Sequence, residues 1–187
     1  MIANRLEVSP VPDLNLILDN MSETHPGLTP ALADALAEAA RVCLARHHSS
    51  PTDFDIRYRG KTLSARMTWE TPTSRERAAN GNEPDATRDA AYSISFAAIE
   101  KCEDLVVVAR AEHMSGSDFY IGPRTSGPGD LEDALRLEVS GTDAGDRKEC
   151  LRRLEQKRAQ AINAAHAIPA VASVVGIHEA LILVADC

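Results

Sequence analysis

Residues 135–141 read Leu-Arg-Leu-Glu-Val-Ser-Gly and carry the clearest strand pattern in the chain. Apolar and polar residues alternate, and side chains two positions apart lie on the same face of a strand. We therefore predict a strand with its leucines and valine on one face and with Glu138 in mid-strand on the opposite, polar face. We expect Gly141 to end this strand.

A helix and two strands are predicted before this segment. Asp85 caps a helix that runs to about Lys101, with one face of small residues and one of bulky residues. Residues 105–109 (LVVVA) form the continuous apolar run typical of a strand inside a sheet, and residues 119–121 (FYI) form the next strand. A Gly/Pro-rich loop over residues 125–129 leads to the alternating segment.

A helix and two strands are also predicted after it. A long amphipathic helix covers residues 146–166, and strands follow at residues 171–177 and 181–184. From Asp85 onward the order is helix, three strands, helix and strand, with one extra strand at the end. We therefore predict an α+β fold.

The first 84 residues are predicted to form an extension of this unit. Thr29-Pro30 starts a helix that ends near residues 47–51, and alternating residues from Phe54 to Trp69 predict a β-hairpin. The polar stretch 71–84 has no apolar period and is interpreted as a mobile loop. Residues 14–18 fit either a strand or a short helix. We expect the extension, residues 1–84, and the core, residues 85–187, to form one compact unit.

The composition narrows the class of protein. The chain has 187 residues, 44% of them hydrophobic, which excludes a disordered chain. No apolar run approaches the roughly 18 residues that span a bilayer, and the first residues lack the order of a signal peptide, so a cytoplasmic protein without membrane contact is expected. The four cysteines lie far apart and include no C-x-x-C pair, which argues against a zinc site or a disulfide framework. The net charge of −8 repels phosphate but leaves room for a local basic strip.

Two carboxylates stand out in the predicted core. Asp118 lies at the start of the second core strand and Glu138 in the middle of the third. On neighbouring strands, two such groups can converge on one divalent cation, and hard oxygen ligands suit Mg²⁺ or Mn²⁺. The plainer alternatives are that Asp118 is a turn residue and that Glu138 simply faces solvent.

With these residues, the region from Asp85 to Ile177 resembles the PD-(D/E)xK, restriction-endonuclease-like nuclease superfamily. The resemblance covers about half of the chain and implies an αβββαβ core, a mixed central sheet flanked by helices. It implies that Asp118 is the aspartate of the second strand and that Glu138 opens the (D/E)xK tripeptide. It further implies an acidic metal ligand from the first helix, for which Asp85 and Asp89 qualify, and Asp89 is carried forward with Asp118 and Glu138 as a metal ligand.

The tripeptide departs from the superfamily pattern, because Ser140 stands where the family places lysine. That lysine neutralises the charge that develops on the scissile phosphate. Some members supply the cation or amide from the following helix, where Arg153, Gln156, Lys157 and Gln160 lie at helical spacing. Lys157 is our choice for the catalytic cation.

Two hypotheses about function follow from the resemblance. The first is a divergent Mg²⁺- or Mn²⁺-dependent nuclease-like enzyme that hydrolyses phosphodiester bonds of DNA or RNA in bacterial defence or nucleic-acid processing. Asp118, Glu138 and Lys157 would be its catalytic residues. The alternative is a catalytically inactive nuclease-fold subunit or adaptor that binds a protein partner or a second copy of itself.

Overall fold

The computed structural model describes residues 12–112, 117–163 and 167–187. Its helical segments are η1 (Met21–Glu23), α1 (Pro30–His47), α2 (Ser74–Ala79), α3 (Glu83–Glu103) and α4 (Arg147–Asn163). Its strands are β1 (Leu14–Leu16), β2 (Thr52–Tyr58), β3 (Lys61–Met67), β4 (Leu105–Arg110), β5 (Phe119–Pro123), β6 (Leu135–Thr142), β7 (Ala170–Gly176) and β8 (Leu181–Asp186).

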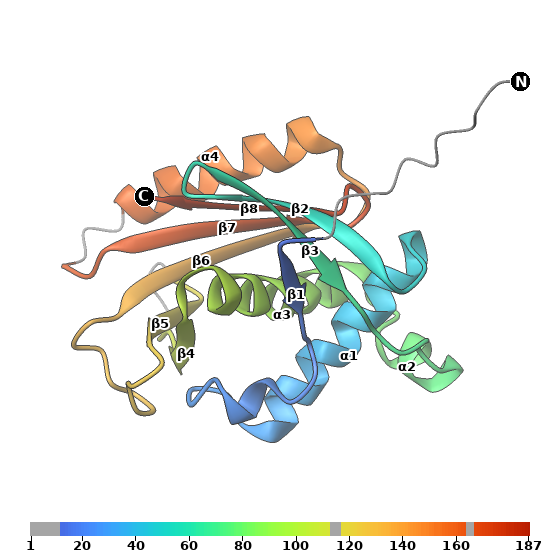
Figure 1. Ribbon diagram of the computed structural model, residues 1–187, viewed down its shortest axis with the longest axis horizontal. Coiled ribbons are helices and arrows are strands. Elements are labelled where there is room, and N and C mark those ends of the chain that lie inside the picture. The colour runs from blue at the N-terminus through green and yellow to red at the C-terminus, as the bar shows by residue number, and fades with distance from the viewer. Residues whose placement is uncertain (1–11, 113–116, 164–166) are drawn as a thin grey trace, which may run out of the picture.

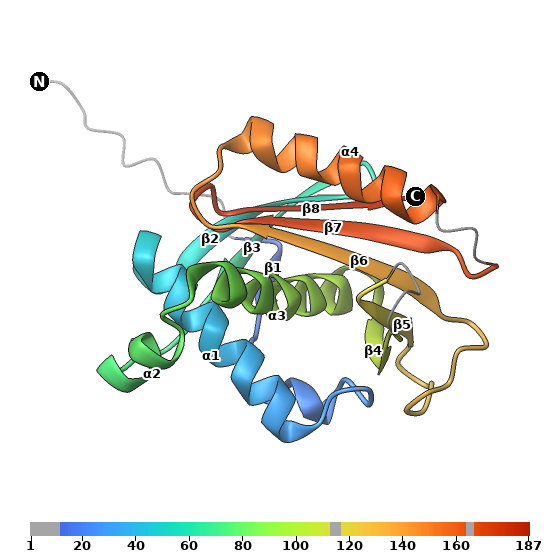
Figure 2. The ribbon, with the colours of Figure 1, turned by 180° about the vertical axis from the view of Figure 1, so that it is seen from behind.

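These strands form one mixed sheet in the order β1-β3-β2-β8-β7-β6-β5-β4 (Figure 1). Helices α1 and α3 lie on one face of the sheet and α4 lies on the other (Figure 2). None of the helices in the described residues is long and apolar enough to cross a membrane. The predicted α+β class is confirmed.

The core from residue 85 has the predicted element order, α3-β4-β5-β6-α4-β7. Strands β4, β5 and β6 pair antiparallel in succession, and β6 pairs with β7 in parallel. The parallel pair needs a crossover, which α4 provides on the face opposite α3. Assignment of this core to the restriction-endonuclease-like fold stays a prediction.

The N-terminal hairpin extends the same sheet. Strand β2 pairs in parallel with β8, with Asp55 opposite Leu181, and β3 pairs with both β2 and β1. The segment that fitted either a strand or a short helix is therefore a strand at Leu14–Leu16. One hydrophobic cluster includes Phe54 of β2 together with Phe96 of α3 and Phe119 of β5. Residues on both sides of position 84 thus share a sheet and a core.

The predicted mobile loop at residues 71–84 is wrong. Residues Ser74–Ala79 form α2, whose first turn is closed by a capping box. The Thr73 hydroxyl accepts from the Glu76 N–H at 3.2 Å, and the Glu76 carboxylate accepts from the Thr73 N–H at 2.6 Å. These two bonds satisfy N–H groups that a helix start leaves free, so a helix forms without an apolar stripe. Helix α3 begins at Glu83, two residues before the predicted cap.

Helix α3 lies unusually close to β6 at Gly141. A Cβ atom placed on Gly141 would lie 2.7 Å from the carbonyl oxygen of Thr87 and 2.9 Å from the Cβ of Ala91. Both neighbours belong to the helix, and the carbonyl is backbone, so neither can rotate away. Glycine at this position therefore sets how near α3 approaches the sheet.

We expect Gly141→Ala to destabilise the protein by about 1–3 kcal/mol, because the added methyl group must push α3 away from β6. Urea denaturation followed by circular dichroism measures the change. Gly127→Ala is the matched control, since a Cβ there meets nothing within 4 Å, and its free energy of unfolding should stay within about 0.5 kcal/mol of wild type. A Gly141→Ala protein as stable as wild type would contradict the close approach.

Candidate active site

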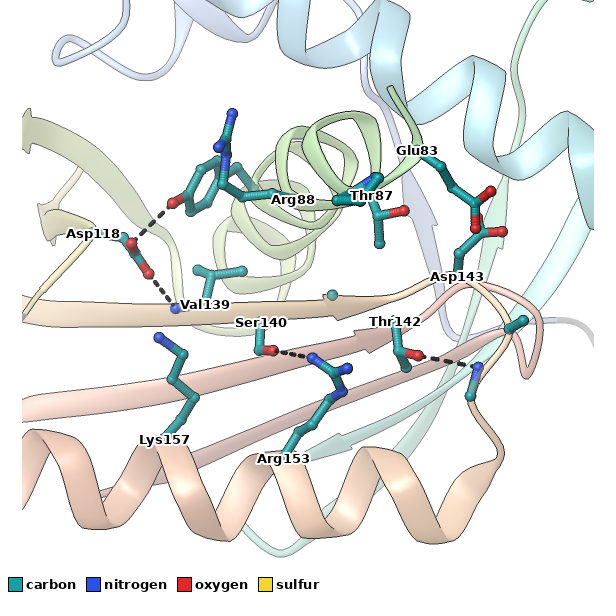
Figure 3. A pocket seen from close by; sticks show the side chains of 15 residues that line it. Glu83, Thr87, Arg88, Asp118, Val139, Ser140, Thr142, Asp143, Arg153 and Lys157 are labelled. Atoms are coloured by element: carbon teal, nitrogen blue, oxygen red, sulfur yellow. Dashed lines mark hydrogen bonds between the residues drawn. The ribbon is translucent and has the colours of Figure 1, made fainter. Parts of the chain in front are cut away.

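A pocket opens along β6 where β5 stops pairing with it (Figure 3). The paired register of β5 and β6 begins at Phe119 opposite Leu137, whereas β6 continues against β7 as far as Thr142. In the described part of the chain, no strand covers the edge of β6 beyond Leu137 on the β5 side. Helix α3 forms one wall and α4 the other, and the open groove between them has a volume of about 600 Å³.

Asp118 lies at one end of this pocket, directly before β5. Its backbone N–H donates to the Leu137 carbonyl at 3.0 Å, which makes it the last residue paired to β6. Its side chain makes the next bond to β6, because Oδ2 accepts from the Val139 N–H at 2.8 Å. Oδ1 accepts from the Tyr92 hydroxyl, also at 2.8 Å. Each carboxylate oxygen keeps a further acceptor site, because each has two lone pairs.

Tyr92 of α3 fixes one oxygen of that carboxylate. Its ring is buried and packs edge-on against Phe119, with the ring centroids 5.0 Å apart. Burial and the negative charge of Asp118 raise the pKa of the Tyr92 hydroxyl, so it remains a proton donor at neutral pH. The sequence gives Tyr92 only as a bulky residue of a buried helix, and no motif marks its bond to Asp118.

Glu138 lies on the α4 side of β6 and is only 6% exposed. Its Oε2 accepts from the Nζ of Lys157 at 2.7 Å. Burial raises the pKa of the Glu138 carboxyl, the Lys157 ammonium opposes that rise, and the charge of Asp118 adds to it. The alternative that Glu138 simply faces solvent is therefore wrong, because α4 covers the polar face of β6.

The predicted site residues do not all reach the pocket. Asp118 and Lys157 line it, whereas Glu138 is not among its lining residues and bonds to the ammonium of Lys157. Asp89 is not a lining residue either, and it accepts from the Nε of Arg88 at 2.9 Å. The acidic residue of α3 that does line the pocket is Glu83.

Glu83 lies near the far end of the pocket, next to Asp143 (Figure 3). Both oxygens of Asp143 are already engaged, one by Arg46 at 3.3 Å and the other by the Nε2 of His47 at 2.9 Å. These contacts tie the turn after β6 to the end of α1. The acidic far end therefore has a structural role of its own.

Three cationic side chains also line the pocket: Arg88, Arg153 and Lys157. Four residues of α4 are candidates for the catalytic cation or amide. Lys157 bonds to Glu138 and Arg153 bonds to Ser140, whereas Gln156 and Gln160 are exposed. Two of the four candidates, one turn apart, therefore point to β6.

The candidate ligands for a metal ion are the carboxylates of Asp118 and Glu138. Within the described ranges, no group of three or more His, Cys, Asp or Glu side chains could hold a metal ion. Mg²⁺ usually keeps several waters and takes only one or two protein carboxylates together with substrate phosphates. Each oxygen of Asp118 has one hydrogen-bond partner among the described residues, and Asp118 and Glu138 could supply those ligands.

Comparisons with family models, with curated proteins and with solved structures gave no match for this chain.

Lys157→Met should destabilise the protein in a pH-dependent way. The variant leaves the buried Glu138 carboxylate unpaired, so the pKa of that carboxyl rises further. A carboxyl group whose pKa is raised by folding stabilises the protein most in acid, and this contribution is lost as the pH rises through the folded-state pKa. We expect a loss of about 2 kcal/mol near pH 8, shrinking as the pH falls toward about 4.3, measured by urea denaturation over a pH series.

The control for this experiment is Lys157→Met combined with Glu138→Gln, which leaves no buried charge. Its stability relative to wild type should not show the steep fall above about pH 4.3. A loss in Lys157→Met that is the same at every pH would show that the ion pair does not govern the ionisation of Glu138.

Proposed function

We propose that this protein is a divergent metal-dependent nuclease that hydrolyses phosphodiester bonds. The observation that carries the proposal is the bond of 2.7 Å between Lys157 and Glu138. It brings a lysine from α4 to the strand that carries Glu138, although position 140 of that strand is serine. The cation missing from the tripeptide is thus supplied from the next element of the chain.

The neighbouring strands supply the second carboxylate. Asp118 precedes β5, and its Oδ2 accepts from the backbone N–H of Val139, the residue after Glu138. The charge of Asp118 contributes to the raised pKa of Glu138, as expected for two acids in one neighbourhood. Asp118 and Lys157 therefore line the same pocket, and Glu138 bonds to the ammonium of Lys157.

Each of these groups has a role in the proposed hydrolysis. A Mg²⁺ ion held by Asp118 and Glu138 would help to deprotonate a water molecule and offset charge on the phosphate. Lys157 donates to the phosphate oxygens as negative charge builds on them, and Tyr92 and the Val139 N–H keep the Asp118 carboxylate in one orientation. The attacking water loses a proton to solvent as its oxygen bonds to phosphorus, the ester P–O bond breaks, and the leaving oxygen takes up a proton from solvent.

A second candidate function is a nuclease-fold subunit that binds without cutting. It is favoured by the engagement of Lys157, whose ammonium already bonds to Glu138 at 2.7 Å. In such a subunit, the lysine would neutralise a buried acid and serve stability alone. The two functions differ in whether the purified protein turns over substrate.

We expect the purified protein to cut single- or double-stranded DNA or RNA when Mg²⁺ or Mn²⁺ is present and not in EDTA. Asp118→Asn, Glu138→Gln and Lys157→Met should each lower the rate about 100-fold or more, because each removes a charge that acts in the transition state. Cleavage of a labelled oligonucleotide on denaturing gels measures the rate.

Glu155→Gln is the matched control, since Glu155 is an exposed acid of α4 paired with Arg158. Its rate should equal that of wild type, and thermal melting should show that each variant is folded. Wild-type rates in Asp118→Asn and Glu138→Gln would refute the assignment. Binding of nucleic acid or of a protein without any cleavage would favour the subunit.

A further inference from the structure

The pocket continues well beyond the residues that the proposed reaction uses. Asp118 and Lys157 occupy one end, and the pocket then runs along β6 past Ser140 and Arg153 to Thr142 and Asp143 (Figure 3). Its volume of about 600 Å³ far exceeds the space that one phosphate group fills. The remaining length of the pocket must suit another part of the ligand.

Arg153 is held in the middle of this extra length. Its Nε donates to Oε1 of Glu149 at 2.8 Å, and its Nη1 donates to the Ser140 hydroxyl at 3.3 Å. Its Nη2 has no protein partner among the described residues, so N–H groups of the guanidinium remain free to donate. The bonds to Glu149 and Ser140 thus fix the Arg153 side chain, while part of its guanidinium group faces the pocket.

This arrangement suits a phosphate group. A guanidinium matches the geometry of phosphate oxygens through parallel N–H bonds, and a fixed side chain loses little conformational freedom on binding. The Ser140 hydroxyl is a second donor at the same place, because its oxygen accepts from Arg153 while its own proton can turn toward a ligand.

The spacing of Arg153 and Lys157 along α4 indicates which phosphate of a nucleic-acid strand Arg153 would bind. Arg153 and Lys157 are four residues apart, so they lie on one face of the helix with Cβ atoms about 5–6 Å apart. Successive phosphates of a nucleic-acid strand are separated by a comparable distance. If Lys157 contacts the scissile phosphate, Arg153 lies one nucleotide step along the strand.

We infer that Arg153 and Ser140 form a second phosphate subsite, which binds the phosphodiester group next to the scissile one. This inference rests on the proposed function and narrows its substrate class to polynucleotide strands, in place of isolated phosphodiesters. Arg88 lines the opposite wall from α3, whereas Arg153 shares a face of α4 with Lys157, the side chain proposed to contact the scissile phosphate. Arg153 is therefore the side chain on which the subsite depends.

The test compares Arg153→Gln with Arg152→Gln. Arg152 is the matched control because it is the next residue of α4 and bonds to the same carboxylate, Glu149, at 2.6 and 2.8 Å. It does not line the pocket, and 55% of its side chain is exposed. Both variants lose one positive charge, so a general charge effect would appear in both.

Two measurements are made on each full-length variant. The first is kcat/KM with Mg²⁺ for a labelled oligonucleotide and for bis(para-nitrophenyl) phosphate, which has a single phosphate. The second is equilibrium binding of the same oligonucleotide in EDTA, by fluorescence anisotropy at several salt concentrations.

We expect Arg153→Gln to lower the ratio of the two kcat/KM values, oligonucleotide over single diester, about tenfold, the size of a lost charged hydrogen bond. It should also weaken oligonucleotide binding about tenfold and reduce the slope of log K against log salt by about 0.7, as for one lost phosphate contact on a single strand. Arg152→Gln should leave the ratio and the slope at their wild-type values.

An equal fall for both substrates in Arg153→Gln would overturn the subsite, because Arg153 would then act at the scissile phosphate, and the proposed nuclease function would stand. Equal effects of the two variants on binding would overturn it as well. If the wild type cut neither substrate, the proposed function would fail, and the binding comparison alone would still decide whether Arg153 contacts the strand.

Discussion

The ion pair between Lys157 and Glu138 is the contact on which the site depends. An acid that is only 6% exposed on a sheet face is costly unless a cation reaches it, and Lys157 does so at 2.7 Å. The same bond joins α4 to the middle of β6, while Cys150 and Leu154 pack the helix onto β7 and β8. A charge that the sheet could not bury alone thereby fixes the helix that carries the second cation, Arg153.

The pocket itself results from the unequal lengths of two strands. Strand β5 pairs with β6 only as far as Leu137, and the Asp118 side chain then accepts from the backbone N–H of Val139 in β6. The sheet edge is thus finished by a carboxylate, which satisfies the backbone and leaves acceptor sites facing the cavity. Structural and chemical roles of Asp118 are therefore compatible.

Periodicity predicted much of the fold, because alternation and helical spacing report local structure directly. It predicted the core order from α3 to β7 and the hairpin of β2 and β3. It missed α2, whose signal is the capping pair Thr73 and Glu76 within a wholly polar stretch. It also placed Glu138 on the correct strand face but could not tell that α4 covers that face, since burial depends on contacts distant in sequence.

The serine at position 140 and the lysine at position 157 are physically linked. Glu138 and Ser140 lie on the face of β6 that α4 covers. From α4, Lys157 bonds to Glu138 and Arg153 bonds to Ser140. A lysine at position 140 would bring a third cation against these two, and like charges at short range in a half-buried space repel strongly. Serine instead accepts from Arg153 and leaves the space for it. Serine at position 140 therefore suits a strand that already receives two cationic side chains from α4.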